Sequence, residues 1–221
     1  MDRRIDARIM QDLQYLRAQM DSSESLQQKV TRLFLCAGQQ ETARHTESVV
    51  QWALRLADQF EADPESAATA AWLHDVSKVW SPTTQLEAAP LLGIEILPEE
   101  RKAPSLIHQK ISRVFAEALF DIDNPGILNA IRCHTTSRPG ASRLGDITVV
   151  ADKLSWQPGQ APFRRHMEEA LETSLRAAVF VYLNYLWANR SEIPAVHPQM
   201  AEAYRELSRD FAPRQGPLSQ V

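Results

Sequence analysis

Residues 67–75 read AATAAWLHD, an alanine-rich helical run that ends in an adjacent histidine and aspartate. Neighbouring side chains on a helix point roughly 100° apart, so His74 and Asp75 could approach one metal ion from two sides. A neutral nitrogen and an anionic oxygen together suit iron, manganese, cobalt or zinc. A hydrogen bond within such a pair is also common at helix ends, so the metal interpretation depends on further ligands elsewhere in the chain.

Apolar residues recur at three- and four-residue intervals along most of the chain, which predicts an all-α protein. The chain has 221 residues, of which 44% are hydrophobic, and this is enough for one substantial core. Asp63-Pro64 and Asn124-Pro125 predict helix starts, because each places a capping side chain before a proline. The expected helices cover about residues 5–20, 24–36, 43–60, 64–75, 107–120, 125–134, 144–156, 163–189 and 197–211.

This pattern divides the chain into four regions. We expect an N-terminal helical extension over residues 1–40, a metal-binding core over 41–157, C-terminal helices packing on the core over 158–211, and a flexible tail over 212–221. Four prolines between residues 81 and 105 predict an irregular or short-helix connection. The apolar face of the expected long helix 163–189 could form a homodimer, or it could cover the core.

Charge and cysteine content exclude several classes of function. The net charge of −4 gives no electrostatic basis for binding duplex nucleic acid or an anionic membrane, although a small anionic substrate remains open. The first residues hold no apolar targeting segment, and no run is long enough to span a membrane. The two cysteines lie far apart in sequence, which favours a reducing, cytoplasmic setting.

Three further positions place metal-ligand side chains where burial is expected. His45 shares the apolar stripe of its helix with Val49 and Trp52, although a lone histidine there is more often a hydrogen-bonded core residue. Asp152 ends the apolar run 147–151, and burying its carboxylate is costly without a compensating cation or hydrogen bonds. An ion pair with Lys153 or a helix cap is the alternative interpretation of Asp152.

The combination of His45, the His74-Asp75 pair and Asp152 on separate helices resembles the HD-domain superfamily of metal-dependent phosphohydrolases. The resemblance covers about residues 43–156, over half the chain. It implies an all-α HD-domain helical bundle, here with extra N-terminal and C-terminal helices.

Two more histidines extend the resemblance: His108 opens one expected helix and His134 closes another. Residues 71–78 (AWLHDVSK), 134–140 (HTTSRPG) and 150–152 (VAD) are similar to the YqeK subfamily of symmetrical diadenosine tetraphosphate hydrolases, which produce two ADP. The resemblance implies two divalent metal ions, with iron expected and manganese or cobalt as alternatives. The implied ligands are His45, His74, Asp75, His108, His134 and Asp152, with Asp75 bridging.

The expected substrate is a small nucleotide whose phosphoanhydride is cleaved by water that the metals activate. Asp75 and Lys78 are the expected catalytic residues, and Lys78 lies three residues after Asp75, so it would also bind phosphate on the same face. Thr135, Thr136 and Arg138 follow His134 and could donate to phosphate, although such a run is also typical of a solvated polar turn.

Alternative functions remain open from the sequence. A mononuclear HD 5′-nucleotidase would use His108 and His134 to contact phosphate, and a di-iron HD oxygenase would use the same six ligands. A nucleotide-sensing domain without activity is the non-catalytic alternative. Three stretches depart from the subfamily pattern and bear on the substrate more than on the metals: Ser137, Gln109-Lys110 and residues 152–157.

Overall fold

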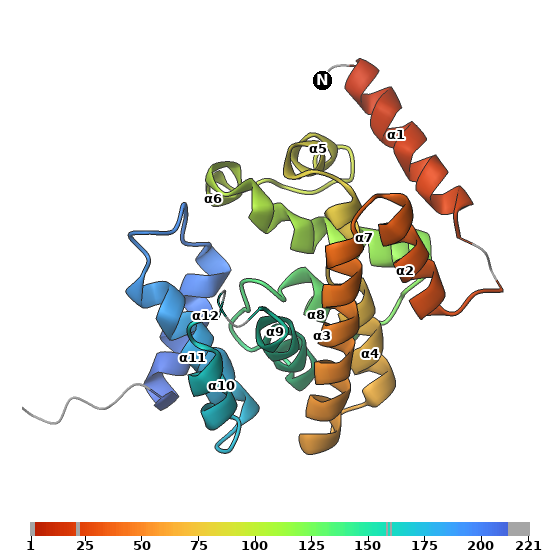
Figure 1. Ribbon diagram of the computed structural model, residues 1–221. Helices are drawn as coiled ribbons and strands as arrows, with labels where there is room; N and C mark the ends of the chain where they lie inside the picture. The colour runs from red at the N-terminus through yellow and green to blue at the C-terminus, as the bar shows by residue number, and fades with distance from the viewer. Residues whose placement is uncertain (1–2, 21–22, 158, 160, 212–221) are drawn as a thin grey trace, which may run out of the picture.

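The computed structural model describes residues 3–20, 23–157, 159 and 161–211, and it is built from helices (Figure 1). No strand occurs within those residues, so the all-α prediction is confirmed. The predicted flexible tail, 212–221, lies outside the described residues. The elements are α1 (Arg3–Ala18), α2 (Leu26–Cys36), α3 (Gln40–Gln59), α4 (Pro64–Leu73), the 3₁₀ helix η1 (Val76–Val79), α5 (Pro82–Ala88), α6 (Pro98–Lys102), the 3₁₀ helix η2 (Pro104–Ile107), α7 (His108–Phe120), α8 (Pro125–Arg132), α9 (Arg143–Leu154), α10 (Arg164–Ala170), α11 (Leu175–Ala188) and α12 (Pro198–Phe211).

Capping side chains set the helix starts as the sequence predicts. The Asp63 carboxylate accepts the backbone N–H of Ser66 at 2.8 Å, and Asn124 caps α8 in the same way, each with proline at the first helical position. Between residues 81 and 105 the chain forms the short helices α5, α6 and η2, which confirms the predicted short-helix connection.

The predicted continuous helix over 163–189 is wrong. The chain forms α10 and α11 instead, with a break before Ser174, whose hydroxyl accepts the backbone N–H of Ala177 at 3.1 Å. A serine that caps a new helix competes with continuation of the old one. Leu171 and Leu175 on the two sides of the break are both buried, so the turn keeps the apolar pattern unbroken and hides the boundary in the sequence.

Two hydrophobic clusters make up the interior. The first joins α3, α4 and α9 to the C-terminal helices α10, α11 and α12, and the second joins α1, α2, α5, α7 and α8 to the other side of α4. Ala67 and Ala71 of α4 belong to the first cluster, whereas Ala70 and Leu73 belong to the second. Helix α4 therefore joins the two clusters, and its C-terminal end, where His74 and Asp75 follow, lies between them.

Helix α9 is the most enclosed element. It packs against α3, α8 and α11 (Figure 1), and every residue from Gly145 to Leu154 is buried. The apolar face of α11, including Val179 and Leu183, packs on this first cluster. The face that could have formed a homodimer thus covers the protein's own core. None of the described helices has both the length and the apolarity needed to cross a membrane.

We expect Ser174→Ala to lower the free energy of unfolding by about 1 kcal/mol, because the first turn of α11 loses its side-chain cap. Urea denaturation of the variant and the wild-type protein measures the difference. Ser191→Ala, at an exposed turn residue, is the matched control. Equal stability of the two variants would show that Ser174 does not define the start of α11.

Candidate metal centre

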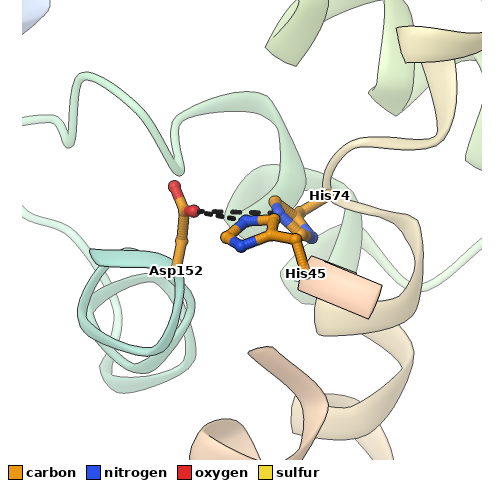
Figure 2. A group of neighbouring side chains, drawn as sticks. All are labelled: His45, His74 and Asp152. Carbon is orange, nitrogen blue, oxygen red and sulfur yellow. Dashed lines mark hydrogen bonds and ion pairs between the residues drawn. The ribbon is translucent and has the colours of Figure 1, made fainter. Parts of the chain in front are cut away.

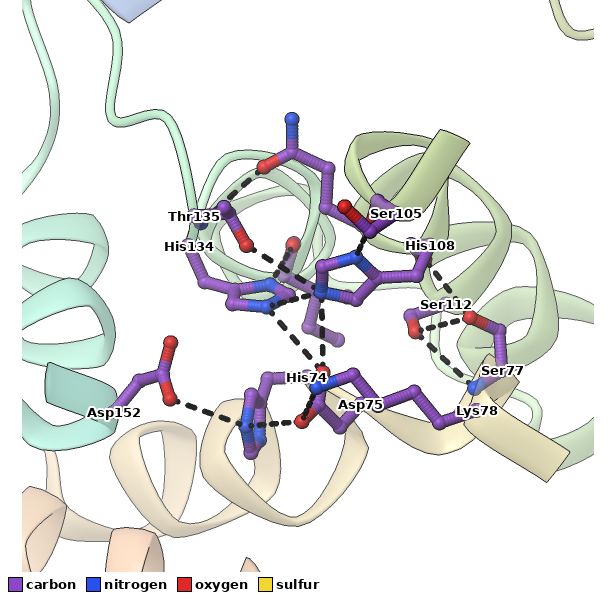
Figure 3. A network of polar contacts seen from close by, with 12 residues as sticks. His74, Asp75, Ser77, Lys78, Ser105, His108, Ser112, His134, Thr135 and Asp152 are labelled. Atoms are coloured by element: carbon purple, nitrogen blue, oxygen red, sulfur yellow. Dashed lines mark hydrogen bonds and ion pairs between the residues drawn. The ribbon is translucent and has the colours of Figure 1, made fainter. Parts of the chain in front are cut away.

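All six side chains predicted as metal ligands lie together between the two hydrophobic clusters (Figures 2 and 3). They come from five places in the fold: α3, the turn after α4, the start of α7, the turn after α8, and α9. In that order they are His45, the His74-Asp75 pair, His108, His134 and Asp152. Most are buried, and His45, with 22% of its side chain exposed, is the most accessible member.

One group consists of His45, His74 and Asp152 (Figure 2). Oδ1 of Asp152 lies 3.0 Å from Nε2 of His45 and 3.9 Å from Nε2 of His74. One ligand atom from each residue falls within 4.8 Å of the others. Two imidazole nitrogens and a carboxylate oxygen at this separation can converge on a single cation.

Asp75 connects this group to a second one (Figure 3). Its Oδ2 atom lies 3.2 Å from Nε2 of His74, whereas its Oδ1 atom lies 3.1 Å from Nε2 of His108 and 3.5 Å from Nε2 of His134. The two oxygens of one carboxylate therefore face two different sets of histidine nitrogens. This is the arrangement that a bridging carboxylate between two metal ions requires.

Backbone carbonyls fix which nitrogen of each ring carries the proton. Nδ1 of His74, His108 and His134 lies 2.7, 2.5 and 2.8 Å from the carbonyl oxygen three residues earlier in the chain. A carbonyl can only accept, so each Nδ1 is the donor and the neutral ring presents a lone pair at Nε2. The three Nε2 atoms are the ones that face Asp75.

The lone pairs and carboxylate oxygens of the cluster face one another with too few protons between them. Nε2 of His108 and Nε2 of His134 are only 2.9 Å apart. Nε2 of His74 and Oδ1 of Asp75 are buried and make no hydrogen bond to any described residue. Buried acceptors without donors are costly, and a metal cation supplies the missing positive charge. The residues therefore fit divalent metal ions.

The pKa shifts agree with this donor set. Burial, together with the neighbouring His108 and His74, lowers the pKa of His134 to about 3, so its ring stays neutral. Burial also opposes protonation of His74, but the carboxylates of Asp75 and Asp152 outweigh it and raise the pKa of His74. A proton and a metal ion thus compete for the same Nε2 atom.

Asp152 makes the Lys153 ion pair that the sequence left open as an alternative, and it also faces the histidines of the cluster. Its Oδ2 atom pairs with the buried Lys153 ammonium at 2.5 Å, while Oδ1 faces the histidines and accepts the indole N–H of Trp156 at 3.2 Å. Burial alone would raise the pKa of Asp152, but the Lys153 charge and the His45 contact hold it well below its ordinary value. Lys153 and Trp156 therefore fix the direction of this carboxylate.

Lys78 lies beside Asp75 as predicted, but the two residues are joined by a 3₁₀ helix and not by a continued α-helix. Helix α4 ends at Leu73 and does not continue, because residues 76–79 form the 3₁₀ helix η1. A 3₁₀ helix has three residues per turn, which aligns positions three apart. Nζ of Lys78 accordingly lies 2.6 Å from Oδ2 of Asp75. The Ser77 hydroxyl donates to the His108 carbonyl at 2.9 Å, and this contact joins η1 to the start of α7 (Figure 3).

The three residues predicted to bind phosphate, Thr135, Thr136 and Arg138, lie in three different surroundings. The Thr135 hydroxyl lies 3.4 Å from Nε2 of His108, at the edge of the cluster. Thr136 is buried, and its hydroxyl contacts the side chain of Gln109, which also accepts the Thr135 backbone N–H at 3.2 Å. Gln109, one of the positions where the sequence departs from the subfamily pattern, thus holds this turn in place. Arg138 lines a separate cavity of about 220 Å³.

A cavity of about 1050 Å³ opens onto the cluster at His45, Asp75 and Lys78. Sequence reasoning missed most of its other walls, which come from the start of α3 and from the segment after α9. Trp156, whose large ring favours a core or pocket-wall position from the sequence, is one of these walls. The residues that were missed are Glu41, Thr42, Arg44, Ser48, Ser155, Gln157 and Arg164. The available signal was the position of Arg44 beside His45.

Asp146, a further buried carboxyl group, directly follows Gly145, which lines the smaller cavity. Burial raises the pKa of Asp146 to about 7, although the Arg176 guanidinium, 3.9 Å away, opposes the shift. Glu206 pairs with Arg176 and accepts the Gly140 backbone N–H at 2.8 Å, so this cluster anchors the end of the Thr135–Gly140 turn. Cys133, which also lines the cavity, is buried, and burial raises the pKa of its thiol to about 11.

Comparison with known proteins identifies relatives of this arrangement. The family model described as the HD domain matches residues 42–179. A Lactococcus lactis subsp. cremoris protein, described as an uncharacterized protein in the pepC 5′ region, is 36% identical over 147 residues, which cover 66% of this chain and 74% of the relative. A symmetrical bis(5′-nucleosyl)-tetraphosphatase of Bacillus subtilis is 31% identical over 150 residues, covering 65% of this chain and 78% of the relative.

A solved structure has the same architecture. It is the crystal structure of a predicted HD superfamily hydrolase involved in NAD metabolism from Clostridium acetobutylicum. The superposition has a TM-score of 0.75 at 26% sequence identity and covers 83% of this chain and 97% of the other. The similarity thus extends well beyond the residues of the metal cluster.

We expect the protein to bind two divalent metal ions per chain, and His134→Ala to bind one or none. Elemental analysis after manganese or iron loading measures the stoichiometry. Chelation should also lower the melting temperature, because a ligand at 100 times its dissociation constant stabilises the fold by about 2.7 kcal/mol. His166→Ala is the control, because His166 is exposed and belongs to neither ligand group. Wild-type protein that saturates at one ion would contradict the two-metal arrangement.

Asp146 predicts a specific dependence of stability on pH. Because its folded pKa is raised to about 7, the folded state holds a proton that the unfolded state has already lost above about pH 4. The wild-type protein should therefore lose stability relative to Asp146→Asn as the pH rises from about 4 to 8, on the order of a few kcal/mol. Urea denaturation across this range tests it, with the exposed Asp58→Asn as the control. Parallel stability profiles for wild-type protein and Asp146→Asn would contradict a raised pKa.

Proposed function

Since this chain belongs to the HD-domain family of metal-binding hydrolases, we propose that it is a metal-dependent phosphohydrolase that cleaves diadenosine tetraphosphate symmetrically into two ADP. The substrate assignment draws on the Bacillus subtilis relative, which is described as a symmetrical bis(5′-nucleosyl)-tetraphosphatase. It also draws on the chemistry of the cavity that opens onto the metal centre.

The position of Asp75 carries the proposal. Its carboxylate is 1% exposed, and its two oxygens face separate sets of histidine nitrogens. His45, His74 and Asp152 would hold one ion, His108 and His134 would hold the other, and Asp75 would contact both. We propose iron as the metal, since mixed imidazole and carboxylate ligands suit it, and manganese or cobalt would fit the same donors. Two such ions supply positive charge for phosphate oxygens and lower the pKa of water.

Lys78 is suited to bind the phosphate at which the bond breaks. Its ammonium lies 2.6 Å from Oδ2 of Asp75, yet 43% of the side chain is exposed and lines the cavity. The side chain can therefore hold a phosphate oxygen beside the carboxylate while the central anhydride bond breaks and each half leaves as ADP. Asp75 stays ionised throughout, because His74 and Lys78 outweigh the effect of burial and hold its pKa well below the ordinary value.

The cavity favours a nucleotide polyphosphate over the alternative substrates. Its volume of about 1050 Å³ lies just above the roughly 300–1,000 Å³ typical of small-ligand sites, so it can hold more than a mononucleotide. Arg44, Lys78 and Arg164 give it three cationic side chains, which suit a chain of phosphates. A di-iron oxygenase acting on an uncharged substrate would have no use for these charges.

We expect protein loaded anaerobically with ferrous iron or manganese to convert diadenosine tetraphosphate to ADP as the sole nucleotide product, as measured by chromatography. His74→Ala should lose most of the turnover, because its Nε2 atom faces both Asp75 and Asp152. His166→Ala, which removes an exposed histidine outside the six cluster residues, should retain the turnover.

The products also separate the alternatives. AMP and ATP in equal amounts would mean asymmetric cleavage and would contradict the proposal. Release of inorganic phosphate from mononucleotides, without cleavage of diadenosine tetraphosphate, would identify a nucleotidase. Oxygen consumption by the reduced iron protein would identify an oxygenase.

A further inference from the structure

The structure separates the arginine that the sequence predicts for phosphate binding from the cavity that needs one. Arg138 lines the smaller cavity together with Cys133 and Gly145, none of which lines the larger cavity at the metal centre. The larger cavity contains Arg44 and Arg164 instead. A polyphosphate bound at the metals would thus meet these two guanidinium groups.

Arg164 lines the cavity and is held there by contacts to two of its three guanidinium nitrogens. Its Nε atom pairs with Glu168 at 3.0 Å, its Nη1 atom donates to the Trp156 carbonyl at 3.3 Å, and the group lies 5.9 Å from the centre of the Trp52 ring. No described residue hydrogen-bonds Nη2. The side chain is only 30% exposed, so the guanidinium is preorganised and still has donors to offer to a ligand.

Arg44 stands on the other element of this wall. It lies next to His45 on α3, is exposed, and has no ion-pair partner among the residues that the structure describes. Glu41 and Asp75 are the carboxylates among the cavity residues, and Asp75 is already paired with Lys78. The cavity residues thus include three cationic and two anionic side chains, and Arg164 also pairs with Glu168 outside this set.

Trp156 connects this wall to the metal centre. Its indole N–H donates to Oδ1 of Asp152 at 3.2 Å, its backbone carbonyl accepts from Arg164, and the residue lines the cavity. Trp156 therefore contacts both Arg164 and the carboxylate that faces His45. This part of the wall belongs to the segment after Asp152, where the sequence departs from the subfamily pattern.

We propose that Arg164, assisted by Arg44, is the phosphate subsite of this cavity and determines its preference for nucleoside diphosphates and polyphosphates over monophosphates. The inference rests on the proposed function for the identity of the substrate. A monophosphate bound at Lys78 and the metal centre would offer no phosphate oxygen to Arg164. A second or third phosphate would extend the anion toward Arg164. Arg164 thus takes the role that the sequence suggests for Arg138.

The test is binding of ADP and AMP to manganese-loaded protein, measured by isothermal titration calorimetry, with quenching of tryptophan fluorescence as a second signal. Arg164→Gln should weaken ADP binding about 10-fold or more, the size expected for losing a charge-assisted hydrogen bond, and should change AMP binding much less. Arg164→Lys should recover part of the loss, because it restores the charge without the planar guanidinium.

Arg165→Gln is the matched control, since the neighbouring arginine is 86% exposed and pairs with Glu169 at 2.9 Å. Unchanged ADP affinity in Arg164→Gln, or an equal loss for ADP and AMP, would overturn the subsite. Loss of ADP affinity in Arg138→Gln but not in Arg164→Gln would return the role to Arg138. Wild-type protein that binds ADP through Arg164 without hydrolysing diadenosine tetraphosphate would support the subsite and refute only the proposed reaction.

Discussion

Two buried carboxylates, Asp75 and Asp152, impose the main constraint on this structure. A charged carboxylate removed from water costs several kcal/mol unless cations or hydrogen bonds compensate it. The fold places both groups where α4 and α9 meet, between the two hydrophobic clusters, so water cannot provide that compensation. Lysines provide part of it, through Lys78 for Asp75 and Lys153 for Asp152. Asp152 also accepts the Trp156 indole N–H, and the other contacts are imidazole nitrogens, which compensate a carboxylate only when they carry a proton or share a metal cation.

Carbonyl groups at helix ends orient the imidazole rings of His74 and His134. The last carbonyls of a helix have no partner within the helix and must find donors elsewhere. His74 follows α4 and donates Nδ1–H to the carbonyl of Ala71, and His134 follows α8 and donates to that of Ile131. Each bond satisfies a carbonyl near a helix end and forces the opposite nitrogen to face the carboxylates as a lone pair. Breaks in the helical chain thus orient His74 and His134, whereas His45 and Asp152 lie within α3 and α9.

This dependence on helix ends also explains what the sequence could predict. Helix starts such as Asp63-Pro64 were predictable because capping is local, and His45 and Asp152 stood out because polar groups interrupted apolar stripes. The break at Ser174 was not predictable, because buried leucines continue the apolar pattern across it. The positions of Arg138 and Arg164 were equally hidden, since each depends on how a turn between helices folds back, and periodicity carries no information about that.

The two carboxylates differ in a way that suits hydrolysis. Lys153 is buried and lies against the rings of Trp156 and Tyr182. It therefore stays in its ion pair with Asp152 and cannot reach a ligand. Lys78 is partly exposed, so it can hold Asp75 and a phosphate at once. The Asp152–Lys153 pair therefore stays fixed. The Asp75–Lys78 pair can rearrange, because Lys78 can also bind a phosphate of the substrate. A site built from two pairs like that of Asp152 would leave no accessible cation beside the carboxylate for phosphate.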